Sequence, residues 1–231
     1  MNLKCLLFGV ALMAYVGHVK AIDNRLERVS AAISLKAPGN EAKRYPLTFQ
    51  QSKDKGSDFY LEASEKMPLT IFQTMEEKSD KLQITVCITA LEDTYFNYSQ
   101  QFSTNFHHDN CQFYMPGFWY RRNLRSPKEA PSFHTSDSWI VREDRLSAPL
   151  TGIFSEKDKR FVTVNRLDKL NNETLTTHKA GEVILSGKTS LGFTGFENKN
   201  GTSTLSFGFP YQEAPKSYLR KLTLSPAFLR F

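Results

Sequence analysis

Short runs of β-branched and aromatic residues constrain the fold of this 231-residue chain more than any other feature. From Tyr45 onward, turn residues separate these runs at intervals of about ten residues. We expect strands at residues 45–51, 58–65, 68–76, 81–91, 94–103, 112–121, 138–145, 150–155, 160–166, 181–187, 189–197 and 202–210. So many strands exceed one well-behaved open sheet, which tends to curl or to split into two packed layers. The sequence therefore predicts an all-β fold, a large antiparallel two-sheet β-sandwich in one domain spanning residues 45–231.

One short helix is expected before the strands, in the connection over residues 22–44. Within residues 23–37, apolar residues recur at the three-to-four spacing of an amphipathic helix, at Leu26, Val29, Ile33 and Ala37. Two hairpins are also expected. Asn200-Gly201 tolerates the positive φ angles of a tight turn, and residues 155–159 form a longer polar loop between two apolar runs.

The first 21 residues have the pattern of a secretory signal peptide. A basic start precedes an apolar run over residues 5–16, and Val19 and Ala21 occupy the small-residue positions before a cleavage site. The apolar run is shorter than the ~20 residues that cross a bilayer, and no later run is long enough either, so we expect no membrane span. The sequence predicts export to the periplasm or the extracellular space, with cleavage near Ala21.

Net charge and cysteine content limit the partners and the redox chemistry. The chain has 30 Lys and Arg against 24 Asp and Glu, a net charge of +6, and loss of Lys4 and Lys20 with the signal peptide leaves +4. This mild charge, without an extended basic face, predicts no nucleic-acid partner. Cleavage also removes Cys5 and leaves Cys87 and Cys111; a disulfide between them in an oxidising compartment and a buried free thiol at Cys87 both remain open.

The segment over residues 114–125 is the strongest candidate for a binding site. It combines aromatic residues with three arginines and an asparagine. Aromatic rings cover the apolar face of a sugar, and Arg and Asn donate to hydroxyls or carboxylates. Together with a tryptophan further along the chain, the predicted carbohydrate-binding residues are Tyr114, Trp119, Arg121, Arg122 and Trp139. In the alternative interpretation, alternation places Phe118 and Tyr120 in the core and Trp119 on the other face, and the arginines lie on a solvated loop.

Candidates for catalysis and for metal binding are weaker. His134, Glu143 and Asp144 include the groups that an acid/base pair needs, but residues 142–145 balance their own charges, as structural ion pairs do. Residues 107–111 offer His, Asp and Cys without the spacing of a zinc site. We find no nucleophile elbow, phosphate-binding loop or zinc-binding helix motif. The sequence predicts no metal site and no cofactor.

Three stretches resemble a family, at residues 113–127, 138–152 and 209–215. They look like the N-terminal region of secreted carbohydrate-active proteins of gut Bacteroidetes. In that family a β-supersandwich similar to the galactose-mutarotase fold precedes an (α/α) toroid of the six-hairpin glycosidase type. The resemblance implies that most of the catalytic machinery lies in the toroid. This chain has no helical second half and ends in an apolar and basic stretch over residues 217–231, so we expect a β domain truncated before the toroid.

Three functions remain open from the sequence. The first is an accessory β-sandwich domain of a secreted polysaccharide-processing protein, which binds polysaccharide or oligosaccharide or packs against the missing C-terminal catalytic domain. The second is a self-contained mutarotase-like or lyase-like enzyme that acts on a sugar. The third is a non-catalytic structural protein of the envelope, in which the aromatic residues belong to the core.

Overall fold

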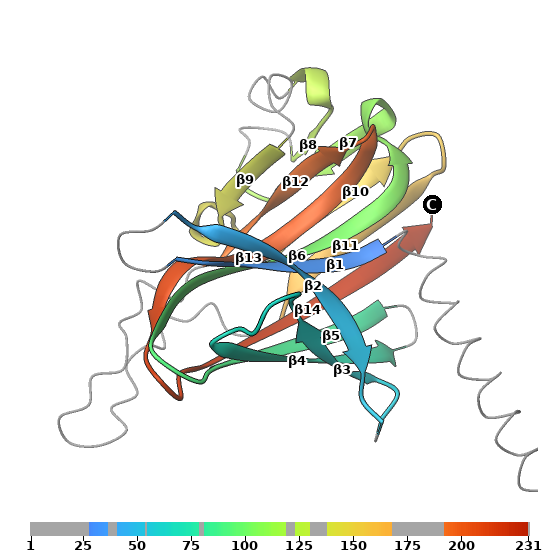
Figure 1. The fold of residues 1–231 in the computed structure, drawn as a ribbon. Coiled ribbons are helices and arrows are strands. Elements are labelled where there is room, and N and C mark those ends of the chain that lie inside the picture. Colours follow the sequence, from blue (N-terminus) through green and yellow to red (C-terminus); the bar gives the residue numbers. More distant parts are fainter. Residues whose placement is uncertain are drawn as a thin grey trace, which may run out of the picture.

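The structure of the chain is a computed structural model that describes residues 28–36, 41–53, 55–78, 81–118, 123–129, 138–167 and 192–230. Most of these residues lie in strands (Figure 1). The strands are β1 (Arg28–Leu35), β2 (Lys43–Gln51), β3 (Asp58–Glu62), β4 (Leu69–Lys78), β5 (Lys81–Ala90), β6 (Thr94–His107), β7 (Cys111–Tyr114), β8 (Leu124–Arg125), β9 (Ser138–Arg142), β10 (Leu150–Ser155), β11 (Arg160–Arg166), β12 (Phe193–Lys199), β13 (Thr202–Ala214) and β14 (Leu219–Arg230). Three single-turn 3-10 helices, η1 (His108–Asn110), η2 (Pro127–Glu129) and η3 (Glu143–Arg145), are the helical elements of the described part. The prediction of a predominantly antiparallel β chain is confirmed.

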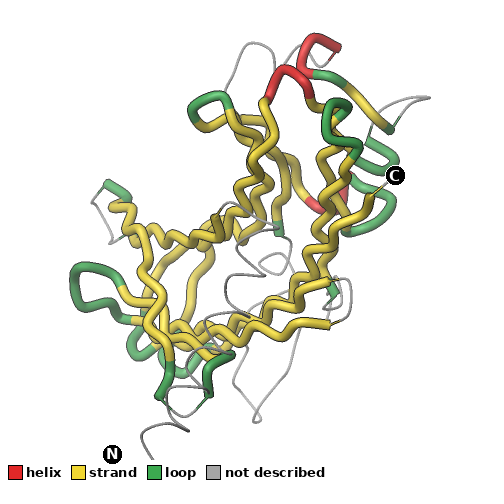
Figure 2. Tube along the Cα trace, turned by 90° about the vertical axis from the view of Figure 1, so that its right-hand side faces the viewer, coloured by secondary structure: helices red, strands yellow, loops and turns green. Residues whose placement is uncertain are grey.

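The strands form one continuous 14-stranded sheet rather than the two separate sheets that the sequence predicted. Its order is β8-β7-β10-β11-β14-β5-β4-β3-β2-β1-β6-β13-β12-β9. Strand β2 pairs with β1 on one side and with β3 on the other, and it crosses between the two arms of the sheet (Figure 1). The sheet bends back on itself, so strands surround a common interior (Figure 2). A long sheet that curls in this way covers one of its faces without dividing into two sheets.

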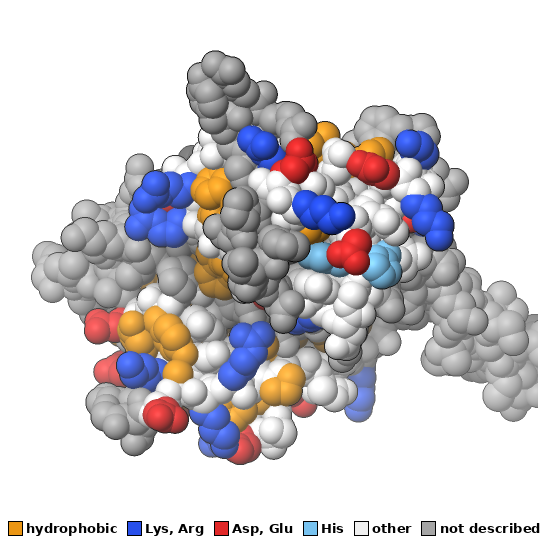
Figure 3. Space-filling model, turned by 90° about the horizontal axis from the view of Figure 1, so that it is seen from above, with side chains coloured by type: hydrophobic (Ala, Val, Ile, Leu, Met, Phe, Trp, Pro, Cys, Tyr) orange, Lys and Arg blue, Asp and Glu red, His pale blue; other side chains and the backbone are white. Residues whose placement is uncertain are grey.

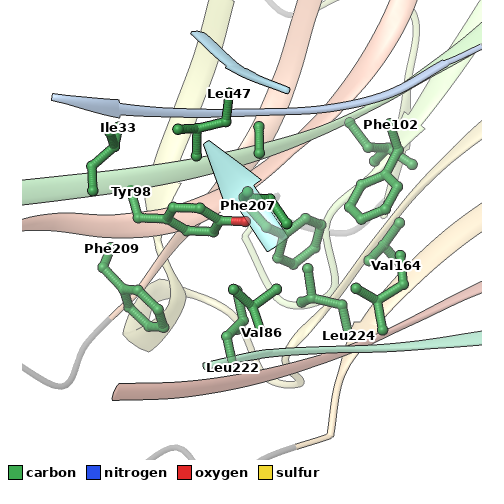
Figure 4. Close-up of a cluster of buried hydrophobic side chains, with 14 of the residues drawn as sticks. Ile33, Leu47, Val86, Tyr98, Phe102, Val164, Phe207, Phe209, Leu222 and Leu224 are labelled. Carbon is green, nitrogen blue, oxygen red and sulfur yellow. The ribbon is translucent and has the colours of Figure 1, made fainter. Parts of the chain in front are cut away.

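The core lies where the two arms face each other. Side chains of β1, β2, β6 and β13 point toward those of β5, β11 and β14 in the close-up (Figure 4). The labelled members of this cluster are Ile33, Leu47, Val86, Tyr98, Phe102, Val164, Phe207, Phe209, Leu222 and Leu224, all buried. Alternation along the strands gives the core its side chains. In strand β5, every second residue from Leu82 to Ala90 is apolar and buried. Burial of each large apolar side chain contributes roughly 1.5–3 kcal/mol.

The predicted helix over residues 23–37 is wrong, because its described part is strand β1. Ile33 is fully buried, and Ala31 is 5% exposed. Strand β1 pairs with both β2 and β6, so it lies inside the sheet. Val29, Ala31, Ile33 and Leu35 also alternate with polar or small residues, and this period of two is the pattern that the sheet uses.

The apolar stretch near the end of the sequence is strand β14, which the sequence analysis did not predict as a strand. It lies between β11 and β5 in the middle of the sheet, with Leu222 and Leu224 in the core. Burial therefore explains its apolar character. Pro226 pairs with Val164 of β11, whereas the pairing of β14 with β5 skips from Leu224 to Ala227. A proline without an N–H is tolerated where a ladder is interrupted in this way.

Both predicted hairpins are confirmed. Strands β12 and β13 are joined by Asn200 and Gly201, whose φ angles are 53° and 79°. Positive φ at both positions is the geometry of a type I′ turn, which Asn-Gly favours. Strands β10 and β11 form the second hairpin, in which Ser155 pairs with Arg160 next to the loop.

No helix in the described part of the chain is long and apolar enough to cross a membrane. The predicted signal peptide and the strand expected at residues 181–187 lie outside the described residues.

Candidate functional site

Two of the predicted carbohydrate-binding residues, Tyr114 and Trp139, lie in the described part of the chain. Trp119, Arg121 and Arg122 lie outside it, as does the catalytic candidate His134. The structure therefore gives the geometry of two aromatic side chains and of the two carboxylates Glu143 and Asp144.

Trp139 belongs to the core side of the sheet. It lies on β9 directly opposite Phe196 of β12, which is fully buried. Its ring packs edge-on against Phe118, with ring centroids 5.6 Å apart. Both side chains are half-buried and pack against the core. For Trp139 the geometry agrees with the interpretation in which the aromatic residues fill the core.

Tyr114 lies on the opposite side of the sheet from Trp139. Its neighbour on β7, Phe113, is fully buried, and the Phe113 ring lies 4.8 Å from that of Phe196. Because successive side chains of a strand point to opposite faces, Tyr114 points away from the core. The structure thus separates Tyr114 and Trp139 and does not bring them into one site.

Tyr114 instead joins two phenylalanines on the outward side of β10 and β11. The Tyr114 and Phe161 rings are 6.0 Å apart and nearly perpendicular, and Phe154 meets Phe161 edge-on at 6.4 Å. Gly152 lies opposite Tyr114, and a Cβ there would come within 2.7 Å of the Phe161 ring. The missing side chain at Gly152 leaves the room that the Phe161 ring occupies. We call Tyr114, Phe154, Phe161 and the adjacent Gln112 the aromatic face.

Polar groups lie beside the rings of the aromatic face. Gln112 lies opposite Phe154, and its side-chain N–H donates to Glu156 Oε1 over 2.5 Å. The three rings and Gln112 are all half-buried, so each still presents surface to solvent. Rings that cover a C–H face, next to an amide and a carboxylate that bond hydroxyls, are the groups that hold a sugar. The sequence indicated Tyr114 for this role but gave no sign that strands β10 and β11 would supply its partners.

Glu143 is the acceptor of a buried ion pair. Its side chain is 2% exposed and that of Arg166, which donates to Glu143 Oε2, is 1% exposed. The backbone N–H of Gly192 also donates to Glu143 Oε2, over 3.1 Å. The Arg166 guanidinium lies 5.5 Å from the centre of the Phe209 ring. This geometry suits a structural ion pair, in which the carboxylate stays charged and accepts hydrogen bonds.

Asp144 points elsewhere and pairs with Arg142 at the surface. Arg142 Nε donates to Asp144 Oδ1 over 3.0 Å, and this hydrogen bond holds the pKa of Asp144 below its usual value. The two adjacent carboxylates therefore have different arginine partners. The sequence indicated self-balancing charges over residues 142–145, which holds for Asp144, whereas the partner of Glu143 is the distant Arg166.

The residues around η1 do not gather as metal ligands. His108 Nδ1 lies 3.2 Å from Ser203 Oγ in a buried position, whereas His107 is exposed near Asp109. The Cys111 thiol donates to the His107 carbonyl oxygen, and burial raises the pKa of this thiol to about 11. Within the described ranges, no group of three or more His, Cys, Asp and Glu side chains fits a metal ion. Cys87 and Cys111 are both free thiols.

Charges of both signs are interspersed on the face seen from above (Figure 3). Charges of opposite sign also form ion pairs on the chain: the Lys43 and Glu65 side chains lie 2.6 Å apart, and those of Lys199 and Glu197 lie 3.1 Å apart. A nucleic-acid binder concentrates Lys and Arg on one face. The face in this view therefore lacks the electrostatic pattern of a nucleic-acid interface.

Comparison with known proteins identifies the fold but no family. No protein-family model and no curated protein matches the sequence. Among solved structures, Slr1438 protein from Synechocystis sp. PCC 6803 is similar at a TM-score of 0.51 and 9% identity, over 85% of this chain and 73% of that chain. The GH36 α-galactosidase AgaA from Geobacillus stearothermophilus is similar at 0.51 and 9% identity, over 86% of this chain and 30% of that chain. A galactose mutarotase related enzyme from Lactobacillus acidophilus aligns at 0.49 and 11% identity, over 85% and 78%.

These likenesses concern the fold. The chain spans less than a third of the α-galactosidase, so the same fold forms a minor part of a larger enzyme there. The β fold that the family resemblance implied fits the Slr1438 protein and the α-galactosidase.

Proposed function

We propose that this chain is an accessory β domain of an exported polysaccharide-processing protein and that it binds carbohydrate through the aromatic face. The observation that carries the proposal is the fold shared with the α-galactosidase, in which this fold accounts for 30% of the chain. Such a domain adds substrate contacts to a protein whose chemistry is performed elsewhere. The three rings around Phe161 supply the apolar surface that this contact needs.

The ion pairs of Glu143 and Asp144, the two catalytic candidates that the structure describes, support a binding role better than a catalytic one. A sugar-processing acid/base pair needs two groups whose environments separate their pKa values, one of them protonated near neutral pH. Glu143 is ion-paired in the interior and Asp144 is paired with Arg142. Neither arrangement favours a protonated acid. Catalysis is therefore assigned to a separate helical domain, against which this β domain packs.

Export is part of the same proposal. A polysaccharide is processed outside the cytoplasm, and residues 1–21 have the pattern of a signal peptide. N-terminal sequencing of the protein recovered from culture medium or periplasm should begin at Ile22. An N-terminus at Met1 in the recovered protein would argue against export by this route.

A glycan array probed with the full chain tests the proposal. The wild-type protein should be retained by a restricted set of plant or host polysaccharides. Tyr114→Ala removes one ring of the aromatic face and should weaken retention roughly three- to tenfold, the value of about one aromatic contact. Tyr95→Ala is the matched control, because Tyr95 stacks on Tyr211 at 5.2 Å, outside the aromatic face. Retention of no glycan by folded protein would favour the structural envelope role instead.

A further inference from the structure

A second outward-facing surface lies on strands β3, β4 and β5. Thr70 lies directly opposite Thr89, and Thr74 lies opposite Thr85. Tyr60 of β3 lies opposite Phe72 of β4, between these two pairs. Directly opposed residues share one side of a sheet, so these six side chains form one surface. We call Thr70, Thr74, Thr85, Thr89, Tyr60 and Phe72 the threonine face.

The threonine face points away from the core. The residues that alternate with it, such as Ile71 and Ile88, are buried at 2% and 1% exposure. Tyr60 by contrast is 51% exposed, and Leu219, opposite Thr89 on the next strand, is 63% exposed. Tyr60 and Phe72 meet edge-to-face with ring centroids 5.3 Å apart. The exposed Tyr60, with the half-buried Phe72 beside it, offers a contact surface that the fold itself does not cover.

The hydroxyl groups of this surface are available. In the part of the chain that the structure describes, the side-chain hydroxyls of the four threonines and of Tyr60 make no hydrogen bond to another protein group. Each threonine presents one hydroxyl and one methyl group from a stiff, β-branched side chain. An ordered array of free hydroxyls therefore stands beside an exposed aromatic pair.

The regularity and the neutrality of the array indicate its ligand. Neighbouring strands are about 4.8 Å apart and Thr70 and Thr74 are four residues apart along β4, so the hydroxyls repeat on a lattice. None of the six side chains is charged, and the charged residues next to them are of opposite sign: Asp58 lies opposite Thr74, and Lys221 lies opposite Cys87. A surface of repeated hydroxyl groups without one predominant charge matches an uncharged ligand that also repeats its hydroxyl groups. Protein interfaces instead depend on Trp, Tyr and Arg anchors, and threonine is under-represented among their energetic centres.

We propose that the threonine face binds the surface of an ordered, uncharged polysaccharide, with Tyr60 and Phe72 against sugar rings and the threonine hydroxyls bonded to sugar hydroxyls. This inference rests on the proposed carbohydrate function and adds a second contact surface to it. The aromatic face, on β7, β10 and β11, and the threonine face are separated in the sheet by strand β14. One protein thus engages a single sugar chain with one surface and a packed polymer with the other.

Depletion of the full chain from solution by microcrystalline cellulose, chitin and insoluble mannan tests the inference. At least one polymer should retain the wild-type protein. Tyr60→Ala and Thr70→Lys should each reduce retention roughly fivefold or more, whereas Tyr60→Phe should keep most of it. Asn105→Lys is the matched control, because it introduces the same charge at an exposed position of β6 outside the threonine face. Circular dichroism and melting temperature show whether each variant is folded.

Two results would overturn the inference. One is equal retention of wild type, Tyr60→Ala and Thr70→Lys. The other is no retention by any polymer, which together with a Tyr60-dependent dimer in light scattering would assign the face to a protein partner. With either result the proposed function still holds if soluble glycans bind the wild-type protein and Tyr114→Ala still weakens that binding. A blank glycan array with Tyr60-dependent retention on an insoluble polymer would instead contradict only the role of the aromatic face.

Discussion

At the scale of single residues, Glu143 shows how burial assigns a role to a carboxylate. Glu143→Gln removes the negative charge that faces the buried Arg166 guanidinium. An uncompensated buried charge is costly, so the free energy of unfolding should fall by about 3–5 kcal/mol. Urea denaturation followed by tryptophan fluorescence measures this change.

The adjacent carboxylate provides the control for this prediction. Asp144→Asn removes one partner of the exposed pair with Arg142 and should leave the urea midpoint nearly unchanged, because exposed pairs contribute little. Equal destabilisation by the two variants would contradict the structural role of Glu143. Loss of a measured sugar turnover in Glu143→Gln at unchanged stability would instead support the catalytic alternative.

Cys111 gives the chain a pH-dependent stability. Burial raises the pKa of its thiol from 9.0 to about 11 in the folded state. Between these values the folded protein keeps a proton that the unfolded chain releases, so stability falls as pH rises from about 9 to about 11. Cys111→Ala should make the decline shallower by up to about 2 kcal/mol. Urea unfolding at pH 8 and pH 10.5 measures the slope, and an unchanged slope in the variant would contradict this assignment.

The difference between Tyr114 and Trp139 marks how far sequence reasoning reaches at this scale. Alternation along a strand predicted Phe118 and Tyr120 on the core side and Trp119 on the other face, but it gave no face for Tyr114 or Trp139. The register of β9 on β12 sends Trp139 to the core side, and the register of β7 on β10 sends Tyr114 outward. Register depends on pairing between segments far apart in the sequence, which no local pattern contains.

At the scale of elements, the β12–β13 hairpin depends on one glycine. Gly201 has a φ angle of 79°, and a Cβ added there would meet no atom within 4 Å. Gly201→Ala should therefore cost about 1 kcal/mol from backbone strain alone. Gly201→Asn should cost less, because Asn adopts positive φ more readily. Thermal unfolding compares the two variants, and equal melting temperatures for wild type and Gly201→Ala would contradict the turn geometry.

Strand β1 is the element for which a local pattern failed. Apolar residues between Leu26 and Ala37 fit a helix, yet a strand between β2 and β6 completes two hydrogen-bonded ladders and buries Ile33. Tertiary pairing thus outweighs a weak helical preference. Strands with strict alternation, such as β5, were predictable because one buried face imposes that period. β14 was not recognised because its apolar side chains and Pro226 do not resemble a strand in isolation.

Ile33 gives a quantitative test of this element. Ile33→Ala should lower the free energy of unfolding by about 2–5 kcal/mol and Ile33→Val by about 0.5–1.5 kcal/mol, because the loss grows with the cavity. Chemical denaturation of both variants measures the difference. Nearly equal stabilities for all three proteins would contradict the burial of Ile33 in the core.

At the scale of the whole molecule, one bent sheet places the aromatic face and the threonine face, the two proposed binding surfaces, on the side away from the core. The sequence predicted most strands but predicted two packed sheets in place of one bent sheet. The two arms belong to one sheet because β2 pairs with both β1 and β3. The same closure keeps Trp139 on the interior side and leaves Tyr114 and Tyr60 on the outward side. The proposed functions of the chain follow from these outward side chains and from its likeness to a minor part of a larger α-galactosidase.

The central claim is that the chain binds carbohydrate without transforming it. Isothermal titration of the full chain with the oligosaccharide selected by the glycan array, followed by chromatography of the sugar after incubation, tests this claim most directly. We predict saturable binding that Tyr114→Ala weakens, with the sugar recovered unchanged. No heat of binding for any selected sugar, or a cleaved or epimerised product that disappears with the Glu143→Gln variant, would contradict the account.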